Sequence, residues 1–200
     1  MRLSYAFTLI MAKAANFYVQ AQDLCLADCV GTGTSKVCTF HIEVDLFASE
    51  LGYFTVSGCD GVMPTLGIEK DVYYKFSQEN TSNYYHPLGL AYYADGAHDD
   101  VDELEPGIVP PGSASACAVD NTCPAPMYMR GGQYLGVYSN NAAITPLTTD
   151  EDDFGLDVYE PEFFLDPVTW NDAGSYEIGL FFDTDDFVQD IFYFCHVSTF

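Results

Sequence analysis

The sequence predicts an all-β domain, built as a sandwich or barrel of short strands. Its aromatic residues favour strands, since the chain has 15 Tyr and 15 Phe but a single Trp. About seven to nine short strand-like segments alternate with turn-rich loops, and no amphipathic helix longer than about two turns is visible. With 200 residues, of which 48% are hydrophobic, the chain is long enough to bury a sizeable core.

The clearest strand runs from Cys38 to Leu46, where hydrophobic residues alternate with polar ones such as His41. This period of two predicts a half-buried strand with His41 on its solvated face. The last strand, 190–197, is apolar on both faces and is predicted to lie in the core. The other segments that favour strands are 53–57, 72–76, 90–93, 134–138, 163–165 and 175–182.

The charge of the chain excludes one large class of partners. Thirty acidic residues against six basic ones give a formal net charge of −24. Such a surface repels phosphate backbones and anionic lipids, so we expect no nucleic-acid partner. Divalent cations and cationic partners remain compatible with it.

The N-terminus predicts a secretory signal peptide over residues 1–21. Arg2 is followed by an apolar run from Leu3 to Met11, and a small-residue cleavage pattern ends at Ala21. The alternative is an ordinary N-terminal strand or helix. No apolar stretch reaches about 20 residues, so we expect no transmembrane segment. Secretion agrees with the cysteine content and with one glycosylation sequon, 80–82 (Asn-Thr-Ser).

Seven cysteines fall into two clusters and one single position. The first cluster, which predicts two disulfides, comprises Cys25, Cys29, Cys38 and Cys59. Cys117 and Cys123 predict a local disulfide that staples an irregular, proline-containing insertion between 97 and 126. Cys195 is then the odd cysteine, with two interpretations: a buried core thiol or a thiolate metal ligand.

Two domain-level units follow the signal segment. Residues 22–61 are predicted to be Cys-rich strands that form part of a sandwich or pack on it. Residues 62–200 are predicted to form the sandwich itself.

Two segments together resemble the cupredoxin, or blue-copper, family. The first is the strand 68–76, with His86 ten residues after it. The second is 173–176 (Ala-Gly-Ser-Tyr), which leads to 193–195 (Tyr-Phe-Cys). The resemblance covers about residues 62 to 196, although a hairpin here separates two halves that form one continuous strand in small cupredoxins.

The resemblance implies a Greek-key sandwich with a copper ion held by His86 and Cys195. Two imidazoles and one thiolate, with a weak thioether, suit copper in both oxidation states. The family's second histidine would fall at Ser198, and its methionine beyond Phe200. We therefore expect either a truncated cupredoxin or a lost or remodelled site. His196 is a candidate replacement ligand, but it points to the opposite side of a regular strand from Cys195.

Two functions remain open. The first is a secreted copper-binding domain that transfers electrons to a redox partner through His86, Cys195 and His196. The second is an acidic extracellular interaction module, metal-free or calcium-binding, whose loops 99–105 and 150–153 would bind Ca²⁺, a mineral surface or a cationic polymer. No hydrolase signature is present, and the absence of His-x-His motifs excludes a multicopper oxidase.

The copper hypothesis makes a geometric prediction. His86 and Cys195 lie far apart in the sequence, so nothing local forces them together. A shared metal ion requires their side chains to approach within about 4–5 Å, given bonds of roughly 2.0–2.3 Å to nitrogen and sulfur.

Overall fold

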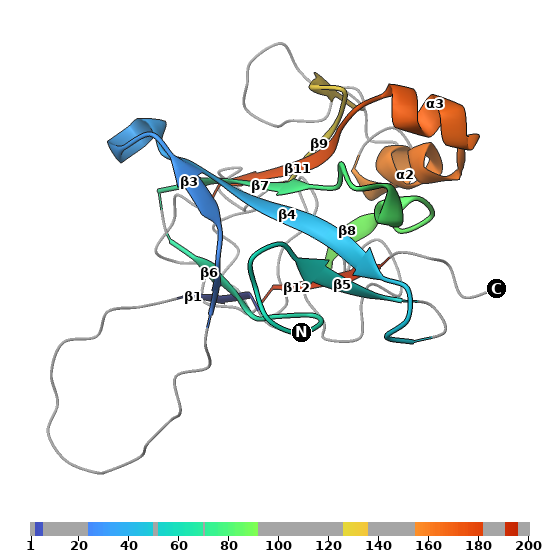
Figure 1. The fold of residues 1–200 in the computed structure, drawn as a ribbon. Coiled ribbons are helices and arrows are strands. Elements are labelled where there is room, and N and C mark those ends of the chain that lie inside the picture. The colour runs from blue at the N-terminus through green and yellow to red at the C-terminus, as the bar shows by residue number, and fades with distance from the viewer. Residues whose placement is uncertain are drawn as a thin grey trace, which may run out of the picture.

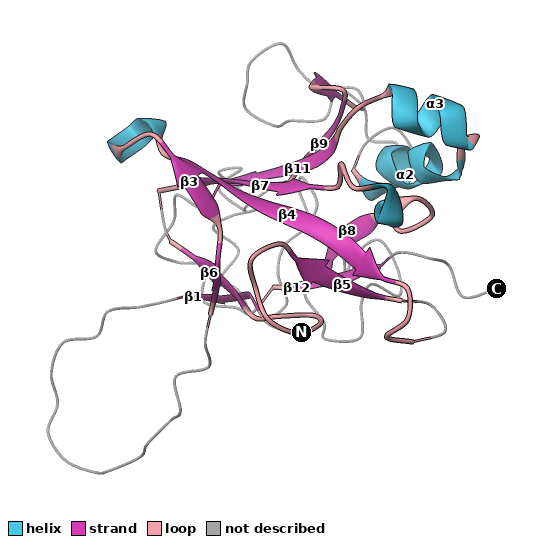
Figure 2. Ribbon diagram, in the orientation of Figure 1, coloured by secondary structure: helices cyan, strands magenta, loops and turns pink. Residues whose placement is uncertain are grey.

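The computed structural model describes residues 3–5, 24–49, 52–69, 71–91, 126–135, 155–181 and 191–195, which are mainly strands (Figures 1 and 2). The predicted all-β class is confirmed at this level. The strands form sheets of seven, three and two members. The finer assignment, a Greek-key cupredoxin sandwich, stays a prediction.

The seven-stranded sheet is the centre of the described fold. Its order is β10 (Gln133–Tyr134), β9 (Met127–Arg130), β11 (Tyr176–Phe181), β7 (Tyr73–Ser77), β4 (Val37–Asp45) and β3 (Asp28–Val30), with β5 (Tyr53–Val56) also paired to β4. β4 and β7 run parallel at the middle of this sheet, with His41 opposite Ser77. Strands of the Cys-rich segment 22–61 therefore form part of the sheet.

β4 buries the face that carries its alternating hydrophobic residues, as predicted. Phe40 and Ile42 are buried, whereas His41 is exposed on the other face. Phe40 lies between two aromatic rings of β7, with centroid distances of 5.8 Å to Tyr74 and 5.5 Å to Phe76. These buried rings pack together at the junction of β4 and β7 and remove apolar area from water there.

Two smaller sheets complete the described strands. One is the parallel set β1 (Leu3–Tyr5), β6 (Leu66–Ile68) and β2 (Cys25–Leu26). The other is the antiparallel pair β8 (Leu88–Ala91) and β12 (Phe192–Cys195). β12 lies beside β5, where the rings of Phe54 and Tyr193 are 6.4 Å apart (Figure 1). The arrangement of the large sheet and this pair is sandwich-like.

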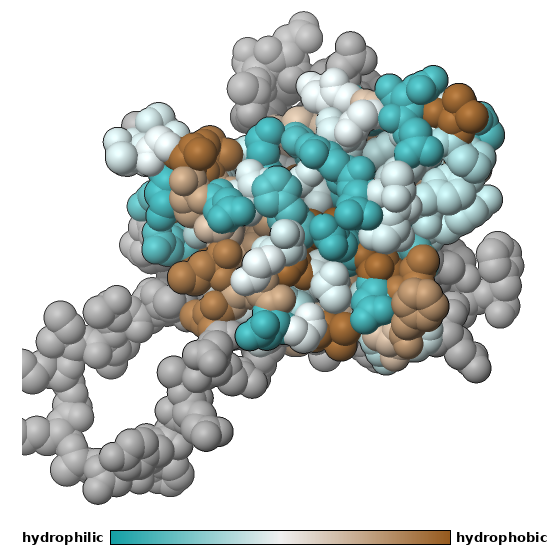
Figure 3. Space-filling model, in the orientation of Figure 1, coloured by the Kyte–Doolittle hydropathy of each residue, from teal (hydrophilic) through white to brown (hydrophobic). Residues whose placement is uncertain are grey.

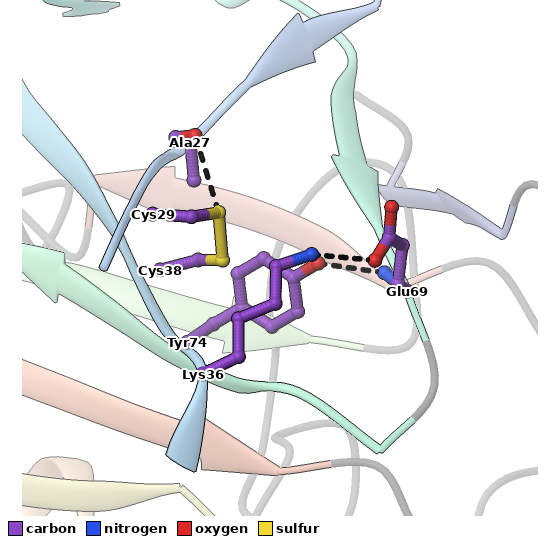
Figure 4. The surroundings of a disulfide bond; sticks show 6 residues. All are labelled: Ala27, Cys29, Lys36, Cys38, Glu69 and Tyr74. Carbon is purple, nitrogen blue, oxygen red and sulfur yellow. Dashed lines mark hydrogen bonds and ion pairs between the residues drawn. A yellow bond between two sulfur atoms is a disulfide. The ribbon is translucent and has the colours of Figure 1, made fainter. Parts of the chain in front are cut away.

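Two disulfides confirm the prediction for the first cysteine cluster. Cys29 and Cys38 are opposed residues of β3 and β4 and are bonded to each other (Figure 4). Cys25 is bonded to Cys59, which joins β2 to the turn after β5. Cys195 takes part in neither bond. Cys117 and Cys123 lie outside the described residues, so their bond stays a prediction.

A salt bridge ties β6 to the edge of β4 near the Cys29–Cys38 bond. Lys36 Nζ lies 2.7 Å from a carboxylate oxygen of Glu69, whose backbone N–H donates to the Tyr74 hydroxyl at 2.7 Å (Figure 4). The Glu69 side chain is 66% exposed. Exposed pairs of this kind contribute little stability, so we assign the positioning of β6 mainly to the hydrogen bond with Tyr74 and to the buried Leu66.

The prediction of a strand at 163–165 is wrong. The segment contains α2 (Leu156–Tyr159), the 3₁₀-helix η5 (Glu160–Phe164) and α3 (Pro167–Asp172). Asp166 caps α3, because its Oδ1 accepts hydrogen bonds from the N–H groups of Val168 and Thr169. An Asp-Pro pair at a helix start is a recognised N-terminal signal, and here it outweighs the short apolar run before it.

Several other boundaries differ from the predicted ones. β6 and β9 were not predicted as strands, and β8 begins at Leu88 rather than at Leu90. Of the predicted strand 134–138, only Tyr134 belongs to a described strand, and 136–138 lie outside the described residues.

The signal peptide also stays a prediction, because most of residues 1–21 lies outside the described part. Within it, Leu3–Tyr5 pair in parallel with β6. Among the described helices, none has the length and hydrophobicity needed to span a membrane.

Candidate metal centre

His86 and Cys195 lie together in the fold. The Cys195 Sγ is 3.4 Å from His86 Nδ1, across 109 positions of sequence. Both side chains are half-buried. The predicted approach is therefore present, while the role of the two residues as metal ligands stays a prediction.

The register of β8 and β12 brings the two residues together. Cys195 is paired with Leu88, and His86 lies two residues before Leu88 in the preceding turn. The next pair, Phe194 and Gly89, requires glycine, because a Cβ at Gly89 would lie 2.6 Å from the Phe194 ring. The absence of a side chain at Gly89 thus allows β12 to reach the His86 turn.

A buried amide pair holds the backbone of that turn. Gln78 and Asn83 are both fully buried. Gln78 Nε2 donates to the Asn83 Oδ1 at 3.0 Å and to the His86 carbonyl at 2.7 Å. Its Oε1 accepts from the Leu88 N–H at 2.9 Å and from the Tyr159 hydroxyl at 3.1 Å. Every hydrogen of the Gln78 amide is used, and its oxygen accepts twice.

Asn83 extends this network to the large sheet. Its Nδ2 donates to the Ile42 carbonyl on β4 at 2.8 Å and to the Asn80 carbonyl at 3.0 Å. The His86 N–H in turn donates to the Asn83 carbonyl at 2.8 Å. Because buried networks of this kind have few alternative arrangements, the position of His86 is fixed relative to β4.

The residue before His86 is held in an uncommon conformation. Tyr85 has a φ of 67°, in the left-handed region that non-glycine residues rarely adopt. Its ring packs on Tyr84 with a centroid distance of 4.1 Å, and the Tyr84 hydroxyl donates to the Leu165 carbonyl at 2.7 Å. Such strain is found where surrounding contacts over-determine the backbone, and it is frequent at functional sites.

Burial lowers the pKa of His86 below its ordinary value of about 6.5. Its imidazole is therefore neutral at neutral pH, which is the form that binds a metal. The Cys195 thiol has to lose its proton on metal binding, so we expect metal affinity to fall in acid.

We predict a pH dependence of stability from the lowered pKa of His86. As pH falls below about 6.5, the unfolded chain takes up the histidine proton before the folded chain does. The free energy of unfolding of the metal-free protein should thus decrease from pH 6.5 downward until the folded pKa has been passed. Urea unfolding from pH 7 to pH 5 measures this. The His86→Gln variant should lose that part of the slope, and an unchanged slope would contradict the prediction.

The distance between the two side chains is that of a hydrogen bond between them, and it also fits a shared ion. With bonds of roughly 2.0 Å to nitrogen and 2.3 Å to sulfur, and an angle between them of about 100–120°, the two ligand atoms lie about 3.3–3.8 Å apart. The observed 3.4 Å lies in this range. A neutral imidazole and a thiolate are also donors that copper favours.

The described residues supply only these two ligands. They contain no group of three or more His, Cys, Asp or Glu side chains arranged to hold a metal ion. His196 follows directly after β12 but lies outside the described residues. The acidic segments 99–105 and 150–153 also lie outside them, so calcium binding stays a prediction.

Gln78 and Asn83 were not predicted from the sequence as part of the site. Both fall in a polar connection between two strands, where amides are usually exposed, and no periodicity distinguishes them.

Comparison of the chain with models of protein families, with curated proteins and with solved structures found no match.

Proposed function

We propose that this chain binds copper through His86 and Cys195 in a secreted, cupredoxin-like domain, and that electron transfer is the role of the bound ion. The observation that carries the proposal is the 3.4 Å separation of His86 Nδ1 and Cys195 Sγ. The two residues are 109 positions apart in the sequence, so only the tertiary fold brings them into contact. Their donor types, one imidazole and one thiolate, correspond to two of the three strong ligands of a type 1 copper site.

The bound copper would supply one-electron chemistry, and the protein would supply a fixed ligand geometry. The amide network around Gln78 supports such rigidity on the histidine side, because it holds the His86 carbonyl and the Leu88 N–H. The pairing of β12 with β8 supports it on the cysteine side. Little rearrangement of the ligands lowers the barrier to electron transfer, and this requires well-supported ligands.

We assign the third strong ligand to His196, which completes the site only if the chain leaves regular strand geometry after Cys195. Two histidines and one cysteine without a thioether would give a site that differs from the common blue-copper type. We therefore expect a thiolate-to-copper absorption band that is weaker or shifted relative to an intact site.

Titration of the full chain with Cu(II), with the absorption spectrum recorded at each step, tests the proposal. We expect saturation at one ion per chain with a thiolate-to-copper band. Cys195→Ser should abolish the band, and His86→Ala should weaken binding by at least about 100-fold, or about 2.7 kcal/mol. His41→Ala is the matched control, because His41 is an exposed histidine on the outer face of β4.

The remaining variants distinguish the alternatives. His196→Ala should reduce affinity if His196 is the third ligand and leave it unchanged if another residue is. Binding of equal strength in the parent chain and in Cys195→Ser would contradict the proposal. In that case Cys195 is a core thiol, and the acidic interaction module becomes the better hypothesis.

A further inference from the structure

A polar hollow of about 350 Å³ lies on the outer face of the large sheet. It is formed by the middle of β4, the end of β7 and the loop after β7. Its lining residues are His41, Ile42, Glu43, Ser57, Ser77, Glu79 and Asn80. Figure 3 shows hydrophilic side chains gathered over β4 on the face turned toward the viewer. The volume lies at the lower end of the range for small-ligand sites, about 300–1,000 Å³.

The floor of the hollow contains a hydroxyl without a partner. Ser77 is 2% exposed, and its Oγ makes no hydrogen bond to any of the described residues. Ser77 lies beside His41 in the parallel register of β4 and β7, and both point away from the core. Buried polar groups are nearly always hydrogen-bonded, so the unpaired Ser77 hydroxyl is available to a ligand or water that brings hydrogen-bonding groups into the hollow.

The glycosylation sequon lies at the rim of the same hollow. Asn80 is exposed, and its Oδ1 accepts from the Ser82 N–H at 2.9 Å. Its Nδ2 donates to none of the described residues, so the nitrogen that would carry a sugar is available. The Ser82 Oγ accepts from the Val44 N–H at 2.9 Å, and this hydrogen bond anchors the sequon to β4.

We propose that Asn80 carries an N-linked glycan and that its first sugar lies in the hollow, hydrogen-bonded to Ser77. The hydroxyl and acetamido groups of such a sugar can donate hydrogen bonds to the Glu43 carboxylate. They can also donate to the Ser77 hydroxyl or accept from it. The carboxylates of the hollow would also accept hydrogen bonds from a free amine. We favour a sugar as the occupant because the sequon places its attachment point, Asn80, at the rim. The two disulfides support passage through an oxidising compartment, where N-glycosylation occurs.

In the attachment step, a bond forms between Asn80 Nδ2 and the anomeric carbon of the first sugar. The bond from that carbon to the diphosphate of a lipid-linked oligosaccharide donor breaks. The amide nitrogen loses one proton, and the lipid diphosphate leaves with the electron pair. The reaction is performed by the host transferase, so this chain supplies only the acceptor and a surface that accommodates the product.

The first test asks whether Asn80 is modified. The full chain is directed into the secretory pathway of a eukaryotic host by a host leader, and the secreted protein is treated with peptide N-glycosidase in heavy-oxygen water. We expect the peptide that contains position 80 to carry aspartate with one heavy oxygen. Asn80→Asp should abolish the glycan while its carboxylate still accepts from the Ser82 N–H. Ser82→Thr should retain it. An unmodified Asn80 in folded, secreted protein overturns the proposal.

The second test asks where the sugar lies. If it is held in the hollow, the glycosidase should release the glycan several-fold more slowly from native than from denatured protein. Ser77→Ala leaves the sequon intact and removes an unpaired buried hydroxyl, so the variant should fold and be fully glycosylated. It should nevertheless release the glycan faster in the native state. Equal release rates from native and denatured parent protein would overturn the placement in the hollow.

Discussion

Replacing Gln78 with leucine is expected to lower the free energy of unfolding by about 3–6 kcal/mol, because four groups, three of them in buried hydrogen bonds, lose their partner at once. The Asn83 Oδ1 and the His86 carbonyl lose a donor, and the Leu88 N–H and the Tyr159 hydroxyl lose an acceptor. Each unsatisfied buried group costs about 1–3 kcal/mol, and partial relaxation reduces the sum. Urea unfolding of the metal-free parent and variant measures the difference.

The same substitution should also affect the metal centre, since Gln78 holds the backbone on both sides of Pro87. We expect copper affinity to fall in Gln78→Leu even though Gln78 contributes no ligand. Gln78→Glu is the matched variant, because its carboxyl oxygens can still accept from the Leu88 N–H and the Tyr159 hydroxyl. It should be more stable than Gln78→Leu at acidic pH, where the carboxyl group is protonated and donates one hydrogen bond.

An exposed amide provides the control for Gln78. Asn171 Nδ2 donates to the Pro167 carbonyl at 2.6 Å, but Asn171 is on the surface of α3. Asn171→Ala should cost at most about 1 kcal/mol, because water replaces the lost hydrogen bond. A cost for Gln78→Leu as small as that for Asn171→Ala would show that the amide network does not support the fold.

These amides mark the limit of what the sequence predicts about the site. The approach of His86 and Cys195 was predicted from a resemblance between short sequence motifs, and the pairing of β12 with β8 brings the two residues together. The network of Gln78 and Asn83 could not be predicted, because its partners are mostly backbone groups. Every residue type carries these groups, so the sequence does not identify them. The left-handed backbone conformation of Tyr85 could not be predicted either, because tyrosine rarely adopts it.

The fold shows a similar division. The nine residues of β4 were predictable because one face is buried and the other is exposed, which produces strict alternation. β6, with three buried residues, has no alternation to detect. Residues 163–165 were assigned to a strand from hydrophobicity alone, although Phe163 is buried and Phe164 is 43% exposed in a 3₁₀-helix. The helix start at Asp166 was the better signal.

Removing the Cys25–Cys59 disulfide by a double substitution with alanine is expected to destabilise the protein by about 4 kcal/mol. The two cysteines are separated by 34 positions, so the bond restricts a long loop of the unfolded chain. In the chain-entropy account, the stabilisation grows with the logarithm of loop length. Thermal and urea unfolding of the parent and the double variant, both metal-free, measure the loss.

The Cys29–Cys38 disulfide is the internal comparison, because its loop spans only 9 positions. The same relation gives about 2.6 kcal/mol for it, so its removal should cost about 1 kcal/mol less. β3 and β4 also remain paired by backbone hydrogen bonds around this bond. Among the described strands, by contrast, none pairs β2 with the turn that carries Cys59. A larger loss from Cys29→Ala/Cys38→Ala than from Cys25→Ala/Cys59→Ala would show that native-state contacts, such as those of the buried Cys38, rather than loop length, set the contribution of this bond.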